Sequence, residues 1–351
     1  MHWGGGSPTY LSPAEINDLG VYIRNSFDVA SDAELSVEVD PRELTRHHLR
    51  ALSKVGLNRM SLGVQDFDPE VQQAVNRVQS EFITRQAVRW SRECGFRSLN
   101  IDLIYGLPLQ TVDTFTGTLN KIIDIDPDRI AVYNFAHVPW LKKHQLLLHP
   151  EDLPSQETKL DLLTMTIKKL ERAGYIYIGM DHFAKPSDEL TIARDNRTLQ
   201  RNFQGYSTRG GSDLFGIGLS AISHFGGSYA QNAKDLESYS NAIREGRFAT
   251  SSGYRMTSDD QIRKHVIMRI MCDLVLDVRE VEAMFGIVFS EYFNGELRAL
   301  YALEEDGLVT LKRSELRVTS EGRLFLRNIA MCFDAYLREY SKGAPQYSKT
   351  V

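Results

Sequence analysis

The segment Met1-His-Trp-Gly-Gly-Gly-Ser-Pro-Thr-Tyr10 is the part of the sequence around which the predicted fold is organised. Its three glycines carry no Cβ, so the backbone can turn sharply and approach a ligand closely. Ser12-Pro-Ala-Glu15 follows with the residues of a capping box and with proline at the first helical position. A glycine loop that leads into a helix offers backbone N–H groups to a ligand. The same pattern is equally typical of a tight turn between a strand and a helix.

The composition is that of a soluble globular protein. The chain has 351 residues, of which 42% are hydrophobic and 25% are charged, enough for one large domain and a smaller one. A net charge of −5 gives no indication of nucleic-acid binding. No apolar run approaches the roughly 20 residues of a membrane span, so we expect no membrane association and a cytoplasmic location. The three cysteines, Cys94, Cys272 and Cys332, do not have metal-ligand spacing.

Strand and helix patterns alternate along the first 180 residues at a spacing of about 30 residues, as in parallel βα units. The apolar periodicity predicts strands at 35–39, 59–64, 99–105, 129–135 and 175–179, and helices at 13–25, 69–76, 80–94, 111–125 and from Ser155 onward. Asp40-Pro-Arg-Glu43 repeats the capping arrangement and predicts a further helix that ends at Gly56. We therefore expect a partial barrel or an open parallel sheet.

The second part of the chain has a different pattern. Residues 186–250 are rich in Gly, Ser, Asn and Arg, which predicts long loops of the kind that carry function. Helices are predicted at 258–275, 278–285, 289–305 and 321–340, with a hairpin between 307 and 319. This order is similar to a winged helix, and since the hairpin is not notably basic we favour a packing or lid domain over a DNA-binding one. The predicted domains are residues 1–250 and 251–351.

Three polar residues, Glu38, Gln65 and Asp102, lie in or directly after successive predicted strands. Active sites of parallel βα barrels form where the carboxyl ends of the strands meet, so these side chains and the glycine loop can surround one pocket. A carboxylate inside an apolar strand needs a partner, such as an ammonium, a ribose diol or an arginine. The alternative is that each carboxylate pairs with a neighbouring arginine or caps the next loop.

Two histidines, His137 and His182, follow predicted strands, and Asp181 precedes the second of them. A single histidine is more often a hydrogen-bonded core residue than a ligand, and neither has the spacing of a zinc site. The sequence has no Walker loop, no G-x-G-x-x-G dinucleotide motif and no G-x-S-x-G nucleophile elbow.

Eight sequence blocks together resemble the oxygen-independent coproporphyrinogen III oxidase family of radical S-adenosylmethionine (SAM) enzymes. They are His2-Trp-Gly-Gly-Gly-Ser-Pro-Thr-Tyr-Leu11, Val37-Glu-Val-Asp-Pro-Arg42, Gly63-Val-Gln-Asp-Phe67, Val75-Asn-Arg77, Asn100-Ile-Asp-Leu-Ile-Tyr-Gly-Leu-Pro108, Gly179-Met-Asp-His-Phe-Ala184, Asn202-Phe-Gln-Gly-Tyr206 and Asn328-Ile-Ala-Met-Cys-Phe333. The resemblance spans the whole chain.

This resemblance implies an α/β fold, a partial (β/α)6 TIM-like barrel with a C-terminal helical, winged-helix-like domain. It implies SAM and a [4Fe-4S] cluster as cofactors, 5′-deoxyadenosyl radical chemistry, and a flavodoxin- or ferredoxin-type electron donor. The implied reaction, in haem biosynthesis, decarboxylates two propionates of coproporphyrinogen III to give protoporphyrinogen IX. The cofactors carry this chemistry, and the protein binds and orients them. The implied protein is a cytoplasmic monomer.

The resemblance also assigns residues. It implies that SAM is contacted by Gly5, Gly6, Ser7, Glu38, Gln65, Arg77, Asp102, Ala136 and Ile222, and that Phe203 and Gln204 lie on the substrate side. The family usually has threonine where Ser7 stands, so the hydroxyl is kept and a methyl is lost. Candidate cations for the substrate carboxylates are Lys185, Arg201 and Arg209, although each of them is also typical of a solvated surface charge.

The sequence departs from the family in the motif that binds the cluster. The family has CxxxCxxC upstream of the glycine loop, and the printed sequence contains no such motif. The three cysteines present do not replace it, since thiolates must converge on one cluster. We therefore expect no cluster ligands in this chain, a missing first barrel strand, and no activity for the polypeptide as printed.

Two other functions fit parts of the sequence. A haem- or porphyrin-binding trafficking protein on the same scaffold would share the glycine loop and Glu38, but the Asn202-Phe-Gln-Gly-Tyr206 block favours the enzyme. A barrel enzyme for a phosphorylated substrate is disfavoured, because no phosphate-binding loop is found late in the barrel pattern.

Overall fold

The computed structural model describes residues 1–202 and 204–337, which fall into two compact units. The first unit contains Met1–Ile192, and the second begins at Ala193. The domain boundary predicted after residue 250 stays a prediction.

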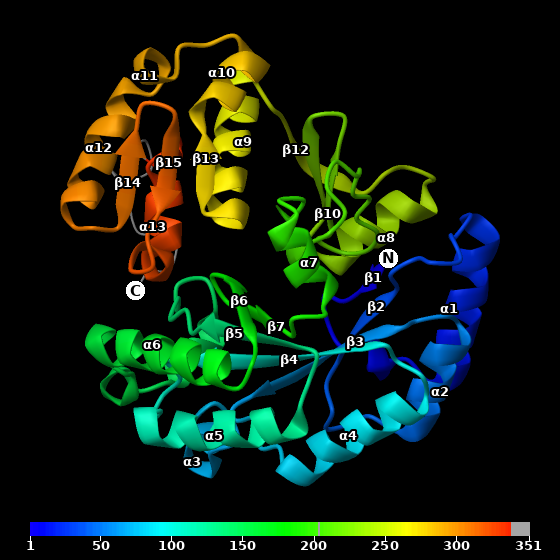
Figure 1. The fold of residues 1–351 in the computed structure, drawn as a ribbon. Helices are drawn as coiled ribbons and strands as arrows, with labels where there is room; N and C mark the ends of the chain where they lie inside the picture. Colours follow the sequence, from blue (N-terminus) through cyan, green and yellow to red (C-terminus); the bar gives the residue numbers. More distant parts are fainter. Residues whose placement is uncertain (203, 338–351) are drawn as a thin grey trace. The chain divides into compact units, whose positions relative to one another are not determined.

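The first unit is built on a seven-stranded sheet with the strand order β1-β2-β3-β4-β5-β7-β6 (Figure 1). The strands are β1 His2–Trp3, β2 Ser36–Val39, β3 Arg59–Gln65, β4 Ser98–Tyr105, β5 Arg129–Asn134, β6 Ile176–Gly179 and β7 His182–Ala184. Strands β1 to β5 are parallel, which confirms the parallel sheet expected from the βα pattern.

The two ends of this sheet differ from the sequence prediction. His2 and Trp3 pair with β2 as a short parallel strand, although the first strand was expected to be missing. At the other end, β7 runs antiparallel to both β5 and β6. Asp181 and His182 therefore do not end a parallel strand as predicted. They lie in and after the turn of a hairpin, where Gly179 and Met180 have positive φ angles.

Helices follow the parallel strands, and a last helix follows the antiparallel β7. They are α1 Pro13–Ser26, α2 Arg46–Lys54, α3 Pro69–Ala74, α4 Glu81–Glu93, α5 Val112–Ile125, α6 Gln156–Arg172 and α7 Glu189–Asp195. Helices α4 and α5 lie along one side of the sheet (Figure 1). Phe115, Leu119 and Ile122 of α5 are fully buried, and burial contributes about 1.5–3 kcal/mol for each such side chain.

Strands β2, β3 and β4 have one buried apolar face and one half-exposed polar face. Val37, Leu62 and Ile101 are fully buried, whereas residues between them in the strands keep contact with solvent. Because successive side chains of a strand point to opposite faces, this alternation separates the core from the candidate site.

The first helix is capped as predicted and the second is not. Ser12 accepts a hydrogen bond from the Glu15 N–H, and Glu15 accepts one from the Ser12 N–H, which completes the capping box. Asp40 was expected to cap the next helix, but α2 begins after Thr45. The carboxylate of Asp40 instead accepts hydrogen bonds from the backbone and guanidinium of Arg42, so it is not available to cap.

The second unit contains more regular structure than the sequence predicted. Its glycine-rich part was expected to form loops, but it forms β8 Gln200–Asn202, β9 Gly205–Ser207, β10 Ile222–Phe225, β11 Ser228–Asn232, α8 Leu236–Arg244 and β12 Thr250–Arg255. Strands β10, β11 and β12 make an antiparallel sheet. Antiparallel strands joined by short turns need few apolar residues, and their sequence is therefore hard to tell from loop.

The remainder of the second unit is mainly helical, as predicted. It comprises α9 Ser258–Asp273, β13 Val275–Asp277, α10 Val278–Phe285, α11 Phe289–Tyr292, α12 Asn294–Glu305, β14 Val309–Lys312, β15 Glu315–Val318, a 3-10 turn at Gly322–Phe325 and α13 Leu326–Met331. The helix predicted over 289–305 is interrupted at Phe293, which is fully buried between aromatic rings. Of the helix predicted over 321–340, the described part is helical only in the last two elements, and residues 338–340 lie outside it.

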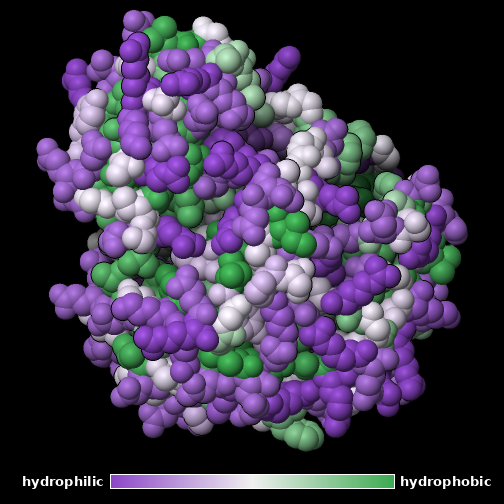
Figure 2. All heavy atoms as spheres, viewed as in Figure 1, coloured by the Kyte–Doolittle hydropathy of each residue, from purple (hydrophilic) through white to green (hydrophobic). Residues whose placement is uncertain are grey.

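The face of the molecule drawn in Figure 2 is covered largely by hydrophilic residues, with hydrophobic residues in separate small groups. Among the helices in the described residues, none combines the length and hydropathy that crossing a membrane requires.

Gly20 provides a test of the packing between α1 and α2. A Cβ at this position would lie 2.4 Å from Cβ and Cγ1 of Val55. We expect Gly20→Ala to lower the free energy of unfolding by about 1–3 kcal/mol through overpacking. Gly117 in α5 is the matched control, because a Cβ there meets no atom within 4 Å. Gly117→Ala should raise stability by about 0.5–1 kcal/mol. Urea unfolding measures both, and equal effects would contradict the packing argument.

Candidate functional site

The polar face of the first unit brings together the residues that the sequence placed on successive strands. The parallel register sets Glu38 of β2 beside Ser61 of β3, and Gly63 of β3 beside Asp102 of β4. Gln65 ends β3, at the carboxyl edge of the sheet. The sequence prediction that these residues share one edge of a parallel sheet is thus consistent with the strand register.

The glycine loop is joined to β2 through Glu38. The Gly5 N–H donates to Oε2 of Glu38 at 3.3 Å, and Nε2 of His2 lies 3.1 Å from Oε1. The hydrogen bond with His2 holds the pKa of Glu38 below its usual value, against the opposing effect of burial. A Cβ on Gly4 would lie 2.5 Å from Nε2 of His2 and 2.9 Å from Cδ of Glu38, so any larger residue there would displace one of these two side chains.

The next two residues of the loop are open. A Cβ on Gly5 or Gly6 would meet no atom within 4 Å, and Gly5 has a φ of +84° that favours glycine. Ser7 is exposed and precedes a 3-10 turn at Pro8–Tyr10, with no side-chain capping bond. The loop therefore leaves space for a ligand directly above its backbone.

Asp102 is held by neutral donors. The Ser61 hydroxyl donates to Oδ2 at 2.7 Å, and the Asn100 amide donates to Oδ1 at 2.7 Å. Asp102 keeps some contact with solvent, but burial among the strands raises its pKa to about 6, and the nearby charge of Glu38 adds to this rise. A carboxylate that has lost part of its hydration and has no cation in direct contact can accept further hydrogen bonds, for example from hydroxyl groups.

Arg77 spans the edge of the sheet beside Gln65. Its Nη2 donates to the Gly63 carbonyl at 2.9 Å, and its Nη1 lies 3.4 Å from Oδ2 of Asp40. Its Nε is buried and makes no hydrogen bond with any described residue. Gln65 itself has a φ of +70°, which is uncommon for a residue other than glycine and is found at functional sites.

The other predicted contact residues lie in different surroundings. The Ala136 carbonyl accepts a hydrogen bond from the Gln145 amide at 3.0 Å. Ile222 begins β10 in the second unit, packed on Gly216, where a Cβ would lie 2.6 Å from the Ile222 carbonyl oxygen. Gln204 is exposed in the turn between β8 and β9, and its N–H donates to Oδ1 of Asn202. Phe203 lies outside the described residues.

The candidate cations differ in their partners. Lys185 forms an ion pair with Asp126 at 2.8 Å. The guanidinium of Arg201 lies over the Tyr206 ring at 5.7 Å from its centroid, and its buried Nε has no hydrogen-bond partner in the described chain. Arg209 is exposed, and its N–H donates to Oγ of Ser207. Lys185 is thus a paired structural cation, whereas the two arginines can still bind an anion.

The two histidines are part of aromatic contacts. His182 meets Tyr133 edge-on, with ring centroids 6.0 Å apart. His137 stacks on Phe135 at 6.4 Å, and its buried Nε2 has no hydrogen-bond partner among the residues described.

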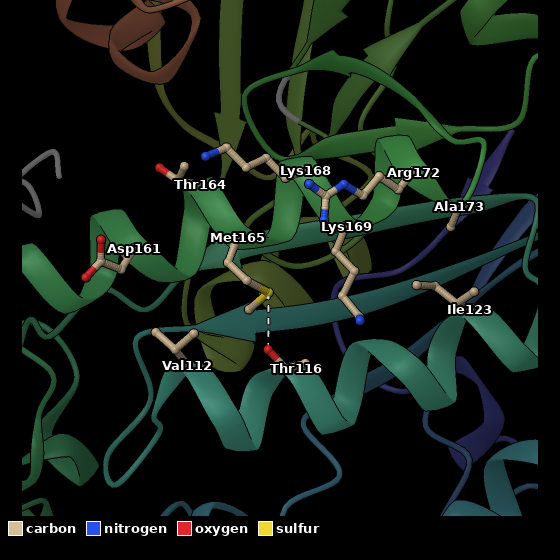
Figure 3. A pocket seen from close by; sticks show the side chains of 10 residues that line it. All are labelled: Val112, Thr116, Ile123, Asp161, Thr164, Met165, Lys168, Lys169, Arg172 and Ala173. Atoms are coloured by element: carbon tan, nitrogen blue, oxygen red, sulfur yellow. Dashed lines mark hydrogen bonds between the residues drawn. The ribbon is translucent and has the colours of Figure 1, made fainter.

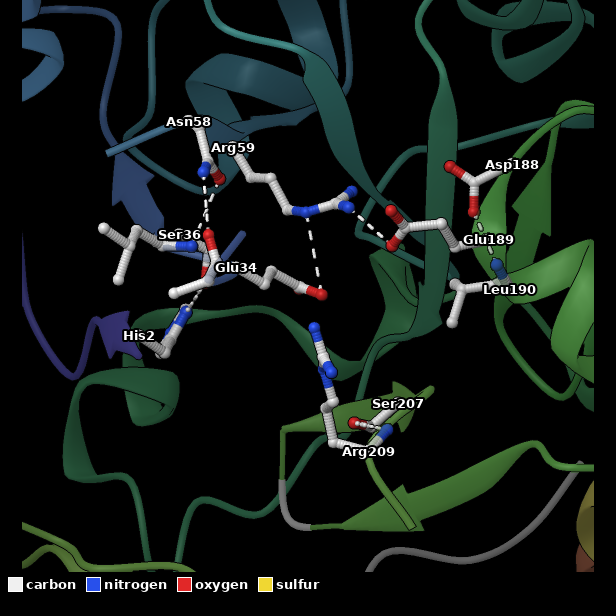
Figure 4. Close-up of polar contacts among 12 residues, drawn as sticks. His2, Glu34, Ser36, Asn58, Arg59, Asp188, Glu189, Leu190, Ser207 and Arg209 are labelled. Atoms are coloured by element: carbon white, nitrogen blue, oxygen red, sulfur yellow. Dashed lines mark hydrogen bonds and ion pairs between the residues drawn. The ribbon is translucent and has the colours of Figure 1, made fainter. Parts of the chain in front are cut away.

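The amino ends of the strands are occupied by ion pairs (Figure 4). Arg59 at the start of β3 pairs with Glu34 at 3.6 Å and with Glu189 at 2.5 Å. Arg129 at the start of β5 pairs with Asp188 at 2.8 Å. These ion pairs lie at the amino ends of the strands, whereas Gln65 and the glycine loop lie at the carboxyl ends.

A groove of about 710 Å³ lies between α5 and α6 (Figure 3). It is lined by Val112, Thr116, Ile123, Asp161, Thr164, Met165, Lys168, Lys169, Arg172 and Ala173. These helices pack on the buried apolar face of the sheet, so the groove does not include Glu38, Gln65 or Asp102. The groove is thus separate from the candidate site.

The described residues fit one of the two implied cofactors. The site fits a small zwitterion with hydroxyl groups, such as SAM. It offers open space at Gly5 and Gly6, an unpaired Nε on Arg77 and the largely buried carboxylate of Asp102. They do not fit an iron–sulfur cluster. Cys94, Cys272 and Cys332 are free thiols, and the described part of the chain has no group of three His, Cys, Asp or Glu side chains able to hold a metal ion.

Three residues of this arrangement were missed by the sequence reasoning, namely His2, Ser61 and Asn100. Each one holds a predicted residue, Glu38 in the first case and Asp102 in the other two. A period of two along β4 places Asn100 on the same face as Asp102, so the strand pattern could have found it. The contribution of Ser61 depends on the register of β3 against β4, which the sequence does not give.

Comparison with known proteins gives consistent matches along the chain. Residues 1–122 match the Radical SAM superfamily model, and residues 256–325 match the HemN C-terminal domain model. The chain is 47% identical to oxygen-independent coproporphyrinogen III oxidase of Salmonella typhimurium, over 100% of this chain and 77% of that protein. It is 47% identical to the protein of the same name from Thermostichus vulcanus, over 93% of this chain and 100% of the relative. A solved structure described as coproporphyrinogen III oxidase (HemN) from Escherichia coli, a radical SAM enzyme, has a TM-score of 0.93 at 47% identity, and the match covers 95% of this chain and 77% of that one.

Asp102 makes folding stability depend on pH. Its pKa of about 6 in the folded chain lies above the value of about 3.9 for an unfolded aspartate. The folded state therefore binds more protons, so this stabilisation is complete below about pH 4 and is lost as pH rises to about 6. We expect Asp102→Asn to remove this dependence and to raise the free energy of unfolding at pH 7.5 by up to about 3 kcal/mol.

Urea unfolding between pH 4 and pH 8 measures the effect. The control is Asp161→Asn, since Asp161 is exposed and lies outside the polar face. It should keep the pH dependence of the unchanged protein. A difference curve for Asp102→Asn that is flat with pH would show that the carboxylate is not perturbed.

Proposed function

The chain belongs to the oxygen-independent coproporphyrinogen III oxidase family, and we propose that it converts coproporphyrinogen III to protoporphyrinogen IX with SAM as cofactor. The observation that carries this proposal is the polar face on which Glu38, Gln65, Arg77 and Asp102 come together at one edge of the sheet. Residues 1–122, which match the Radical SAM superfamily, contain all four of them.

The proposed roles follow from the charges of a bound SAM. The ammonium group is accepted by Glu38, whose lowered pKa keeps it ionised. The carboxylate is bound by the unpaired Nε of Arg77, through a charge-assisted hydrogen bond. The ribose hydroxyls donate to Asp102, and the open backbone of Gly5, Gly6 and Ser7 lies along the methionyl part. When bound, SAM supplies the radical chemistry by which a propionate is decarboxylated.

We further propose that Ala136 and Ile222 contact the adenosine part of SAM, and that Phe203 and Gln204 contact the substrate. They rest on the sequence resemblance. Arg201 and Arg209 are the proposed cations for substrate carboxylates, because neither is paired with a carboxylate in the described residues. A flavodoxin- or ferredoxin-type electron donor, a monomeric state and a cytoplasmic location are proposed on the sequence alone.

Anaerobic turnover tests the proposed reaction. The chain is expressed with an added N-terminal segment that carries the CxxxCxxC motif of the family, is reconstituted with iron and sulfide, and is incubated with coproporphyrinogen III, SAM and a low-potential reductant. We expect protoporphyrinogen IX and two molecules of CO2 for each substrate molecule, measured by chromatography and by radiolabelled carboxyl release. Tight haem binding without CO2 release would instead support the porphyrin-trafficking alternative.

Binding of SAM tests the proposed site without any need for turnover. We expect Asp102→Ala to weaken SAM binding about tenfold to a hundredfold, because a hydrogen bond to a charged group contributes about 1.5–3 kcal/mol. Calorimetric titration measures the dissociation constant. Asp161→Ala, in the groove between α5 and α6, is the control and should bind SAM as the unchanged protein does. The reverse result would place SAM in the groove.

A further inference from the structure

The backbone turns sharply where β3 ends. The N–H of Asp66 donates to the carbonyl of Val64 at 3.0 Å, which closes a three-residue turn around Gln65. Gln65 has a φ of +70°, the sign of the rarer and strained form of γ-turn. The pairing of β3 with β4 shifts at the same point, between Gly63 and Gln65. A strained backbone of this kind persists only where the surrounding structure holds it.

The turn sets the side chain of Gln65 over the polar face of the sheet. A Cβ on Gly63 would lie 3.0 Å from Nε2 of Gln65 and 3.2 Å from Nη2 of Arg77, so both groups lie over this glycine. Gly63 pairs with Asp102 in the sheet, which places the two groups next to the strand position of Asp102. The strained turn therefore determines where the Gln65 amide lies within the candidate site.

The side chain of Asp66 holds the turn from within the core. Asp66 is buried, and its Oδ1 accepts hydrogen bonds from the Thr118 hydroxyl at 2.5 Å and from the Asp68 N–H at 2.9 Å. Its Oδ2 accepts one from the Gln110 amide at 2.5 Å. All three donors are neutral, and burial raises the pKa of Asp66. Both carboxylate oxygens are thus in use, and the side chain cannot move without breaking a buried hydrogen bond.

The same network reaches the turn that follows β4. Gln110 is buried, and its Oε1 accepts a hydrogen bond from the Gly106 N–H at 2.6 Å. Its amide nitrogen must therefore face the other way, where it donates to Asp66 and to the Ile104 carbonyl at 3.0 Å. Gly106 has a φ of +84°, so this turn also leaves the ordinary backbone regions. One buried carboxylate thus joins the chain segments that follow β3 and β4 at the carboxyl edge.

We propose that Asp66 is a positioning residue of the candidate site, which holds the strained turn at Gln65 and joins it to the turn at Gly106. It acts through Gln65 and does not contact the ligand. The inference rests on the proposed function for the identity of that ligand, which is SAM. An asparagine at position 66 offers one acceptor oxygen and turns its NH2 group toward a donor, so Asp66→Asn should release the turn.

Hydrogen exchange measured by mass spectrometry tests the hold on the backbone. In Asp66→Asn we expect peptides covering residues 65–68 and 104–110 to exchange about threefold to tenfold faster than in the unchanged chain. The matched control is Tyr175→Phe. The Tyr175 hydroxyl donates to the Pro127 carbonyl at 2.7 Å, a buried hydrogen bond at the amino edge of the same sheet. Its loss should leave exchange in both segments as it is in the unchanged chain.

Calorimetric titration of SAM tests whether Asp66 acts through Gln65. We expect Asp66→Asn to weaken SAM binding about threefold to tenfold, and Tyr175→Phe to keep the affinity. In a chain that already carries Gln65→Ala, Asp66→Asn should weaken binding no further, because the side chain that it positions is gone. An equal loss with and without the Gln65 amide would overturn the positioning role. Unchanged SAM binding by Asp66→Asn would show that the carboxylate serves the fold only.

Thr118→Val is a second variant, which keeps the proposal testable if Asp66→Asn does not fold. The change nearly preserves size and removes a hydroxyl that donates to Asp66 and accepts the Phe67 N–H at 3.1 Å. We expect faster exchange over residues 65–68 and weaker SAM binding. Unchanged exchange in this variant would show that the network does not hold the turn. If the unchanged chain binds no SAM, the proposed cofactor fails, and hydrogen exchange alone decides on the turn.

Discussion

The parallel register of β2, β3 and β4 is the constraint on which the rest of the first unit depends. It sets Glu38 beside Ser61, and Asp102 beside Gly63, whose carbonyl Arg77 contacts. If the pairing of these strands shifted by one residue, Glu38, Ser61 and Asp102 would point into the apolar core. The core residues of the shifted strand would then be exposed instead. Burial of Val37, Leu62 and Ile101 therefore fixes the polar site as firmly as any contact within it.

The electrostatics of the site follow from this arrangement. Glu38 has His2 and a loop N–H, Asp102 has two neutral donors, and Arg77 has a distant carboxylate and a carbonyl. None of these groups is neutralised by an ideal ion pair. Charges of both signs are thus held at one edge with unused hydrogen-bonding capacity. Such an edge favours a ligand that carries a positive and a negative charge, because that ligand offsets the desolvation of each charged group.

The sequence predicted those features that local patterns determine. The strands carrying Glu38, Gln65 and Asp102 were located within a residue or two, since apolar alternation and helix caps mark them. The cap at Asp40 was wrong because its carboxylate binds Arg42, a competition that the residue types alone do not settle. Pairs such as His2 with Glu38, or Ser61 with Asp102, join segments far apart in the chain. They depend on register and on helix placement, and no local pattern contains that information.

The two edges of the sheet differ in the partners of their polar side chains. At the amino edge, Arg59 and Arg129 each pair with carboxylates, although Nη2 of Arg129 is buried without a hydrogen-bond partner among the described residues. At the carboxyl edge, nitrogen and oxygen atoms of Arg77 and Asn134 are buried without partners among the described residues. The two edges differ in the distance of the nearest carboxylate, which is 2.5 Å for Arg59 and 2.8 Å for Arg129 but 3.4 Å for Arg77. Buried polar atoms without a partner lower the stability of the fold, and a bound ligand can satisfy them. They are therefore expected at the edge of a sheet that binds a ligand.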